Sequence, residues 1–131
     1  MSLKQSVLTL VFLLITGTAL ATPLADGIAL YKKGEYSNAY DQLRPLAKQG
    51  QGEAAYYVGM MYVDGLGVPQ NSTNGVHWLE LAVEYHHRDS AVMLGKMYSS
   101  GMGVPLDVNK AVHFLGLAEK LREPEDTDDC D

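Results

Sequence analysis

The chain repeats itself at an interval of 36 residues, and no other feature limits its fold as strongly. The repeated segments share the string Gly-x-Gly-Val-Pro, at 65–69 and again at 101–105. The identical pairs in this register include Ala55/Ala91, Gly59/Gly95, Tyr62/Tyr98, Gly65/Gly101, Gly67/Gly103, Val68/Val104, Pro69/Pro105, Leu79/Leu115 and Ala82/Ala118. Periods of roughly 20 to 50 residues are typical of solenoids, propellers and arrays built from repeated units.

The first 21 residues predict a signal peptide that is removed from the mature protein. Lys4 precedes an apolar run over 7–15, and the small-x-small sequence at 19–21 is typical of a cleavage site after Ala21. The apolar run is shorter than the roughly 20 residues that span a bilayer, which argues against a membrane anchor. We therefore expect a periplasmic or secreted protein that begins at Thr22 and has no stable membrane insertion after cleavage.

The acidity of the chain is concentrated at its carboxyl end. The net charge is −6 for the whole sequence, yet six of the 16 acidic residues lie in 123–131, which contains no base. Residues 22–122 are nearly neutral and lack the basic stripe of nucleic-acid-binding proteins, so no nucleic-acid partner is expected. The segment 123–131 is predicted to be a disordered acidic tail.

The single cysteine, Cys130, lies in this tail and excludes a disulfide within one chain. Its role stays open between an inert thiol and a link to a second chain. Stability must therefore come from helix packing.

Each repeat predicts two helices joined by the glycine-proline turn. In the first helix, Ala55, Val58, Gly59 and Tyr62 fall at i, i+3, i+4 and i+7, the spacing of one helical face. A glycine within such a face lowers helix propensity by about 1 kcal/mol relative to alanine, so its recurrence predicts a neighbouring helix that approaches closely.

The second helix is expected to begin at a capping side chain, Asn71 or Ser72 in one repeat and Asp107 in the next. Its predicted buried stripe is apolar in both repeats and comprises Gly75, Trp78, Leu79 and Ala82, matched by Ala111, Phe114, Leu115 and Ala118. A third, degenerate helix pair is predicted upstream, because Ala39, Gln42, Leu43 and Leu46 lie 36 residues before the first of these sets.

These motifs resemble the Sel-one-like repeat (SLR) family, whose repeats are related to tetratricopeptide repeats. The resemblance covers 54–85 and 90–121 with the string Ala-x-x-Leu/Val-Gly-x-Met-Tyr-x-x-Gly-x-Gly-Val-Pro, and more loosely 24–50. It implies an all-α fold, a right-handed α-solenoid of about three antiparallel helix pairs. We expect a degenerate repeat at 22–50 and repeats at 51–86 and 87–122 within one helical domain, 22–122.

One position departs from the family pattern. The family usually leaves its second helix through a glycine, as at Gly50, but His86 stands 36 residues later. Histidine adopts the left-handed region less readily than glycine. This turn is therefore expected to be strained or rebuilt with His87.

No catalytic, cofactor or metal site is predicted. His77 and His113 are equivalent through the repeat, and helices 8–10 Å apart or more hold equivalent side chains too far apart to share a zinc ion. The serines lie at caps and turns, and Glu80 and Glu84 form a solvated i, i+4 pair. We therefore expect a protein that is not an enzyme.

The first helices suggest where another protein binds. Their non-core positions are unusually apolar, and stacked repeats present such positions on one concave face. The candidate residues are Tyr56, Tyr57, Met60, Val92, Met93 and Lys96. Packing against neighbouring repeats is the alternative for each of them.

The last helix suggests a second, edge interface at Phe114, Leu117 and Leu121, where another copy could bind to form a homodimer. Members of the resembled family are typically adaptors that bind other proteins in the bacterial envelope. We expect such a module here, with an unknown partner. Two alternatives remain, a periplasmic immunity-type inhibitor of a toxic effector enzyme and, from another class, an envelope hydrolase or ligand-binding enzyme.

Overall fold

The computed structural model describes residues 22–122, which form six helices. They are α2 (Pro23–Lys33), α3 (Tyr36–Lys48), α4 (Gly52–Asp64), α5 (Ser72–Glu84), α6 (Arg88–Ser100) and α7 (Val108–Lys120). The predicted signal peptide, 1–21, and the predicted acidic tail, 123–131 with Cys130, lie outside the described residues.

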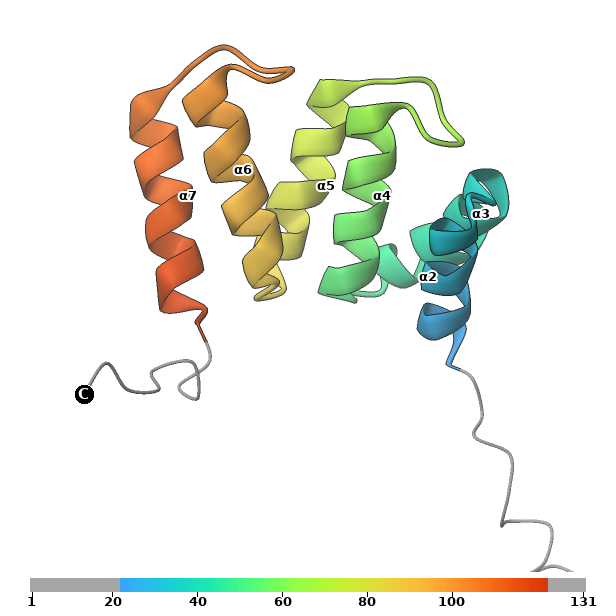
Figure 1. Cartoon of the computed structure of the whole chain (residues 1–131). Coiled ribbons are helices and arrows are strands. Elements are labelled where there is room, and N and C mark those ends of the chain that lie inside the picture. The colour runs from blue at the N-terminus through green and yellow to red at the C-terminus, as the bar shows by residue number, and fades with distance from the viewer. Residues whose placement is uncertain (1–21, 123–131) are drawn as a thin grey trace, which may run out of the picture.

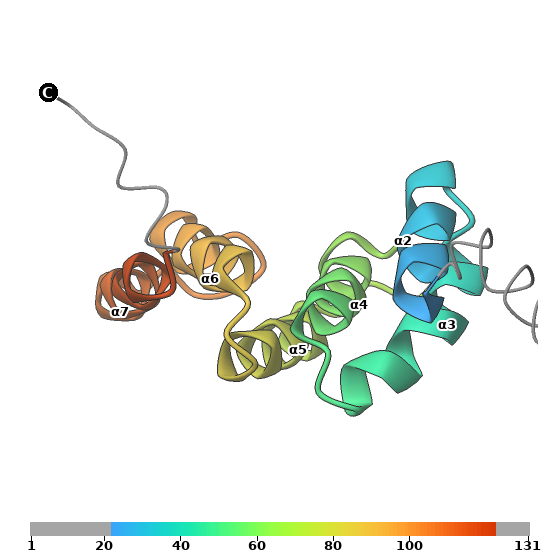
Figure 2. The same cartoon turned by 90° about the horizontal axis from the view of Figure 1, so that it is seen from below.

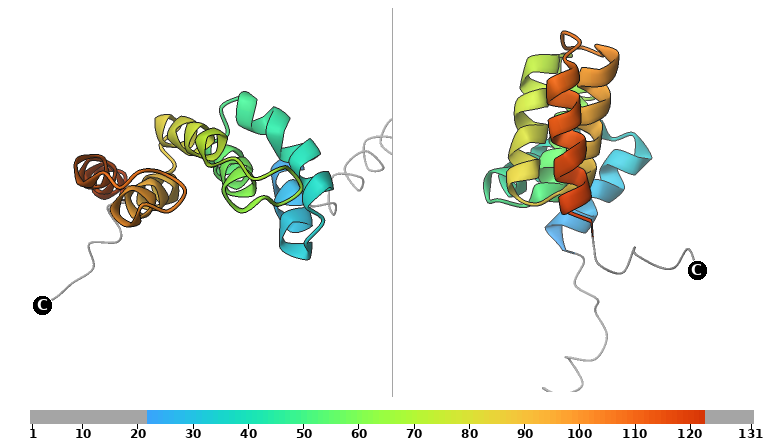
Figure 3. Two further views of the ribbon diagram at one scale, coloured as in Figure 1. Left: turned by 90° about the horizontal axis from the view of Figure 1, so that it is seen from above. Right: turned by 90° about the vertical axis from the view of Figure 1, so that its left-hand side faces the viewer.

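The helices pack in consecutive pairs, as the repeat predicts. The pairs are α2 with α3, α4 with α5 and α6 with α7, and they are joined into a row by contacts of α3 with α4 and of α5 with α6. Seen end-on in Figure 2, α4 and α6 lie along one face of the row and α5 and α7 along the other. Figure 3 shows that the α2/α3 pair is tilted relative to the other four helices. The all-α prediction of paired repeats is confirmed.

The predicted caps and turns set the ends of the helices. Oδ1 of Asn71 accepts from the amide of Asn74, and Oδ1 of Asp107 accepts from that of Lys110, both at 3.0 Å. These side chains satisfy amides in the first turns of α5 and α7. Helices α4 and α6 are capped at their C-terminal ends by Gly65 and Gly101, each with φ 68°, where a residue without Cβ is favoured.

The predicted close helix approach occurs between α4 and α5. A Cβ built on Gly59 would lie 2.9 Å from Cγ of Leu79 and 3.1 Å from the carbonyl oxygen of Gly75. Any side chain larger than a hydrogen atom at this position would push the two helices apart. Close packing of α4 and α5 therefore requires glycine at position 59, and this packing offsets the low helix propensity of glycine.

Two apolar clusters form the core, one around α3 and α4 and one around α5, α6 and α7. Both contain a fully buried methionine, Met61 in the first and Met97 in the second. The first cluster also carries a contact between α3 and α4, since the hydroxyl oxygens of Tyr40 and Tyr62 lie 2.7 Å apart. Their rings meet edge to face, with centroids 5.9 Å apart.

The expectation that Leu115 belongs to a buried stripe is wrong. Its side chain is 45% exposed, whereas Leu79, one repeat earlier, is 0% exposed. Leu79 is enclosed because α6 packs on α5, and among the described residues no helix follows α7 to cover Leu115. Only Ala111 and Ala118 of α7 are buried.

His86 adopts the left-handed conformation that a glycine adopts at the equivalent position of the preceding repeat. Its φ is 62°, the single positive φ at a non-glycine position in 22–122, and the equivalent Gly50 has φ 95°. The amide of His86 donates to the carbonyl of Val83 at 2.9 Å, and that of His87 to the carbonyl of Ala82 at 2.9 Å. The turn therefore keeps the geometry of the turn at Gly50 and places the strain on His86.

Candidate functional site

A groove between α4 and α6 is the leading candidate site. It has a volume of about 250 Å³ and is lined by Tyr56 from α4 and by Asp89, Val92, Met93 and Lys96 from α6. The helices that form it belong to different repeats and lie on the same face of the row in Figure 2. We call it the α4–α6 groove.

Four of the six residues proposed for protein binding line this groove. Tyr56 and Met93 are half-buried and pack against the core, Val92 is also half-buried, and Lys96 is exposed. Asp89 was not selected from the sequence. A single carboxylate in the first turn of a helix is an ordinary surface feature, and only the register of α6 against Tyr56 shows that it borders the groove.

The other two candidate residues serve packing in the structure. The ring of Tyr57 lies 4.9 Å from that of Tyr31 at an angle of 61°, which joins α4 to α2. Met60 packs against the second core cluster. Neither lines the groove, although both keep some exposed surface.

Tyr56 is held by aromatic neighbours on two sides. Its ring centroid lies 5.4 Å from that of Tyr57 and 4.9 Å from that of His87, whose ring is tilted by 37°. Burial, followed by the nearby carboxylate of Asp89, raises the pKa of the Tyr56 hydroxyl. The hydroxyl therefore stays protonated near neutral pH and can donate a hydrogen bond to a ligand.

The inter-repeat turn supports this wall of the groove. Nδ1 of His87 lies 2.9 Å from Oγ of Ser90, and Ser90 is 0% exposed. Burial lowers the pKa of the His87 imidazole, and the carboxylates of Asp89 and Glu53 partly offset that effect. The buried serine hydroxyl orients the imidazole and does not face the groove.

The groove combines apolar walls with two opposite charges at its edge, Asp89 and Lys96. Such a site can enclose an apolar side chain of a partner, while Asp89 and Lys96 pair with polar groups of the partner on either side of that side chain. No group of three or more histidine, cysteine or acidic side chains within 22–122 is placed to hold a metal ion. His77 and His113 are both exposed.

The predicted edge interface is partly covered. Phe114, Leu117 and Leu121 are half-buried, and Phe114 stacks on Tyr98 with centroids 5.8 Å apart and an interplanar angle of 5°. The most exposed apolar side chains of α7 are instead Val108 and Val112, at 62% and 66%. No helix of the described part of the chain is long and apolar enough to cross a membrane.

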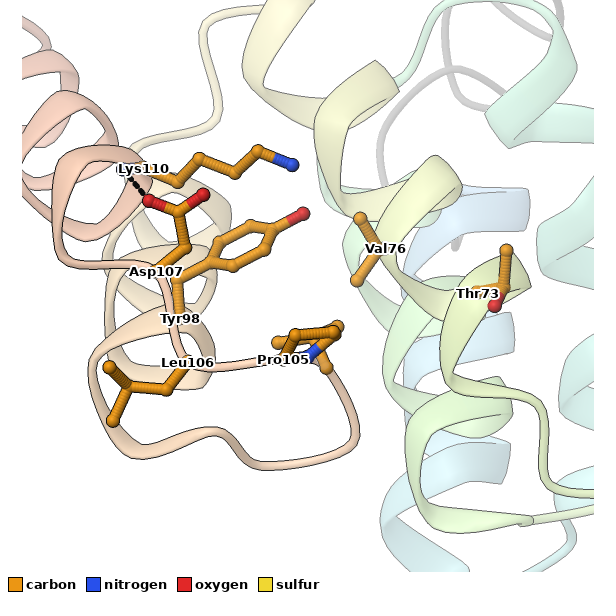
Figure 4. Close-up of a pocket in the computed structure, with 8 residues that line it drawn as sticks. Thr73, Val76, Tyr98, Pro105, Leu106, Asp107 and Lys110 are labelled. Carbon is orange, nitrogen blue, oxygen red and sulfur yellow. Dashed lines mark hydrogen bonds between the residues drawn. The ribbon is translucent and has the colours of Figure 1, made fainter.

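A second cavity, not foreseen from the sequence, lies between α5 and the α6/α7 pair. Its volume is about 240 Å³. Figure 4 draws the residues that line it, which are Thr73, Val76, Tyr98, Val104, Pro105, Leu106, Asp107 and Lys110. The signal that reveals it in the sequence is a comparison of Val76 with Tyr40, which stands 36 residues earlier.

Comparison with known proteins identifies the repeats. The sequence model of the Sel1 repeat matches residues 52–84 and 88–121, just over half of the chain. No curated protein matches the chain.

Two crystal structures share the fold. A Sel1 repeat protein from Oxalobacter formigenes is 26% identical, with a TM-score of 0.60 over 66% of this chain and 66% of that chain. The second is c5321, described as a protective antigen present in uropathogenic Escherichia coli strains that displays an SLR fold. It is also 26% identical, with a TM-score of 0.68 over 77% of this chain and 22% of that one. This chain therefore spans only part of both relatives.

Proposed function

Because this chain belongs to the Sel1 repeat family, whose repeats generally mediate protein interactions, we propose that it is a non-catalytic module that binds another protein. The binding surface is the α4–α6 groove. The observation that carries this assignment is the convergence of Tyr56, Val92, Met93 and Lys96, from two repeats, on one groove.

The residue types in the groove support protein binding. Tyrosine and methionine are enriched in the centres of protein interfaces, because they offer a large contact area and adapt to a partner's shape. Tyr56 is fixed by the rings of Tyr57 and His87, so little side-chain entropy is lost when a partner packs on it. Asp89 and Lys96 at the edge favour a partner that presents complementary charges.

The location proposed for this interaction is the bacterial envelope, with the periplasm preferred. It rests on the signal peptide predicted at 1–21. An exported module that lacks internal disulfides has to rely on helix packing, and the two core clusters provide this for 22–122.

Affinity capture from an envelope extract tests the groove. The bait is the chain without its predicted signal peptide, 22–131, compared with a Met93→Ser/Lys96→Glu double variant. Lys120→Glu, at the end of α7, is the control for the change in charge. We expect one dominant partner with the wild type and the control, and at least a tenfold loss with the double variant. Equal capture by all three proteins, with unchanged melting curves, would contradict the assignment to this groove.

A further inference from the structure

The cavity beside Tyr98 is bordered by three elements. Val76 lies on α5, Tyr98 near the end of α6, and Lys110 in the first turn of α7. In Figure 4 the Tyr98 hydroxyl and the Lys110 ammonium both point toward the side of the cavity on which Val76 lies. Leu106, which is 63% exposed, lies at the rim, so the cavity is open to solvent.

One repeat earlier, an internal tyrosine fills the corresponding place. Tyr62 is equivalent to Tyr98, and Tyr40 is equivalent to Val76. The Tyr40 ring packs edge to face on Tyr62, and their hydroxyl oxygens lie 2.7 Å apart. The chain thus contains an example of what this kind of surface binds, namely a phenol.

Two backbone contacts recur at both places, although the α2/α3 pair is tilted relative to the other four helices. The amide of Asn71 donates to the carbonyl of Tyr62 at 2.8 Å, and that of Asp107 to the carbonyl of Tyr98 at 2.9 Å. The two turns also rest on equivalent points of the preceding helix. A Cβ on Gly67 would meet the backbone of Tyr36 and Ser37, and one on Gly103 would meet the side chain of Ser72.

The side chain that the preceding helix presents also differs between the two places, tyrosine at 40 and valine at 76. Valine lacks the ring and hydroxyl of tyrosine, and a cavity of about 240 Å³ lies beside it. Within 22–122 the Tyr98 hydroxyl has no hydrogen-bond partner like the one that Tyr40 gives to Tyr62. This volume is below the roughly 300–1,000 Å³ of small-molecule pockets and suits a single side chain.

We propose that this cavity binds a tyrosine side chain of a partner protein, which takes the position that Tyr40 occupies one repeat earlier. The partner's ring packs edge to face on Tyr98, and its hydroxyl pairs with the Tyr98 hydroxyl. The ammonium of Lys110, 4.8 Å from the Tyr98 ring centroid, is a second donor for the incoming phenol oxygen. The partner thereby continues an interface that already exists between repeats.

This site shares no lining residue with the α4–α6 groove. Its occupant is also defined by chemistry, so it can be tested without knowledge of the partner. If no phenol binds at this cavity, the assignment of protein binding to the α4–α6 groove is unaffected. If the α4–α6 groove binds no partner, the proposal for this cavity is likewise unaffected.

Titration with p-cresol, the side-chain analogue of tyrosine, followed through backbone amide resonances of 22–131, tests the proposal. We expect saturable shifts at residues 76, 98, 104 and 106–110. Val76→Tyr should abolish them, because its own ring fills the cavity. Val112→Tyr is the matched control at the equivalent, exposed position of α7 and should retain them. Absence of shifts at the cavity, or equal binding to Val76→Tyr, would overturn the proposal.

Blocked amino acids show whether the cavity binds a tyrosine that is part of a polypeptide or only a free phenol. N-acetyltyrosinamide should bind about three- to tenfold more tightly than N-acetylphenylalaninamide, the difference that one net hydrogen bond makes. Tyr98→Phe should weaken this preference, because only the Lys110 ammonium then remains to pair with the phenol oxygen. This second variant keeps the test valid even where Val76→Tyr does not fold. Binding of p-cresol without binding of N-acetyltyrosinamide would overturn a protein partner.

Discussion

His87 and Ser90 lie at the start of α6 with the imidazole Nδ1 2.9 Å from the serine hydroxyl oxygen. The contact ties the strained turn at His86 to the first turn of the helix that provides most of the α4–α6 groove. Because the same imidazole lies against Tyr56, a proton on His87 affects both the turn and the wall of the groove.

Acid is expected to weaken the fold through His87. Burial holds the pKa of His87 below its ordinary value of 6.5, although Asp89 and Glu53 oppose this. The unfolded chain therefore binds the proton more tightly, and the stability that His87 contributes is lost as the pH falls from 6.5 through the folded pKa. Urea unfolding at pH 7.5 and at pH 5.5 should show lower stability at the lower pH.

His87→Gln should reduce this loss, and His113→Gln, at an exposed position, should leave it unchanged. A pH dependence that is the same in wild type and His87→Gln would assign the acid sensitivity to other groups.

Alanine at the two equivalent glycines should have different effects. A Cβ at Gly59 meets Leu79, which is fully buried, and the carbonyl of Gly75. Gly59→Ala should lower the free energy of unfolding by about 1–3 kcal/mol, the usual range for overpacking, despite its gain in helix propensity.

At Gly95 the clash is with the side chain of Leu115, whose Cγ would lie 2.6 Å away. Leu115 can turn outward into solvent, so Gly95→Ala should change stability by less than about 1 kcal/mol. Thermal and urea unfolding of both variants measure this contrast. Similar losses at both positions would show that Leu115 is held as firmly as Leu79.

The 36-residue period predicts the helix pairs, the capping residues and the close approach at Gly59, because each of these depends on local sequence or on packing within one repeat. It does not predict the exposure of Leu115, which is identical to Leu79 in sequence. Burial depends on what covers a residue, and the helix that encloses Leu79 has no counterpart beyond α7 in the described chain.

The candidate site could be predicted only in part for a related reason. The apolar character of Tyr56, Val92 and Met93 marks them as surface residues of interest, but Tyr57 and Met60 have the same character and turn toward other helices. Small rotations of the helices decide which of these residues line the groove and which pack on other helices, and residue type does not reveal such rotations. The cavity beside Tyr98 depends on a difference between repeats, whereas a repeat is recognised by the residues that its copies share.

Truncation of the two equivalent leucines tests the asymmetry in burial directly. Leu79→Ala removes a fully buried side chain and should lower the free energy of unfolding by about 2–5 kcal/mol. Leu115→Ala removes a side chain that is half in solvent and should lower it by about 1 kcal/mol. Chemical denaturation of the two variants gives both values. A loss at Leu115 as large as that at Leu79 would indicate that the outer face of α7 is covered in solution.

Alkaline unfolding should report the tyrosine pair between α3 and α4. Burial, and then the hydrogen bond with Tyr62, raise the pKa of Tyr40 to about 12 from an ordinary value of 10.0. A raised pKa means that the folded state favours the protonated phenol. The stability from this group is thus complete below pH 10 and is lost between about pH 10 and pH 12.

Tyr40→Phe removes the titrating hydroxyl, so its stability should be lower than that of the wild type at pH 8 and should fall less steeply between pH 10 and pH 12. A shallow fall will remain, because burial also raises the pKa of Tyr31, Tyr56 and Tyr57. Urea unfolding at pH 8, 10 and 11.5 provides the comparison. Parallel curves for wild type and Tyr40→Phe would mean that the two hydroxyls are not paired in solution, and the internal precedent for the cavity beside Tyr98 would then be lost.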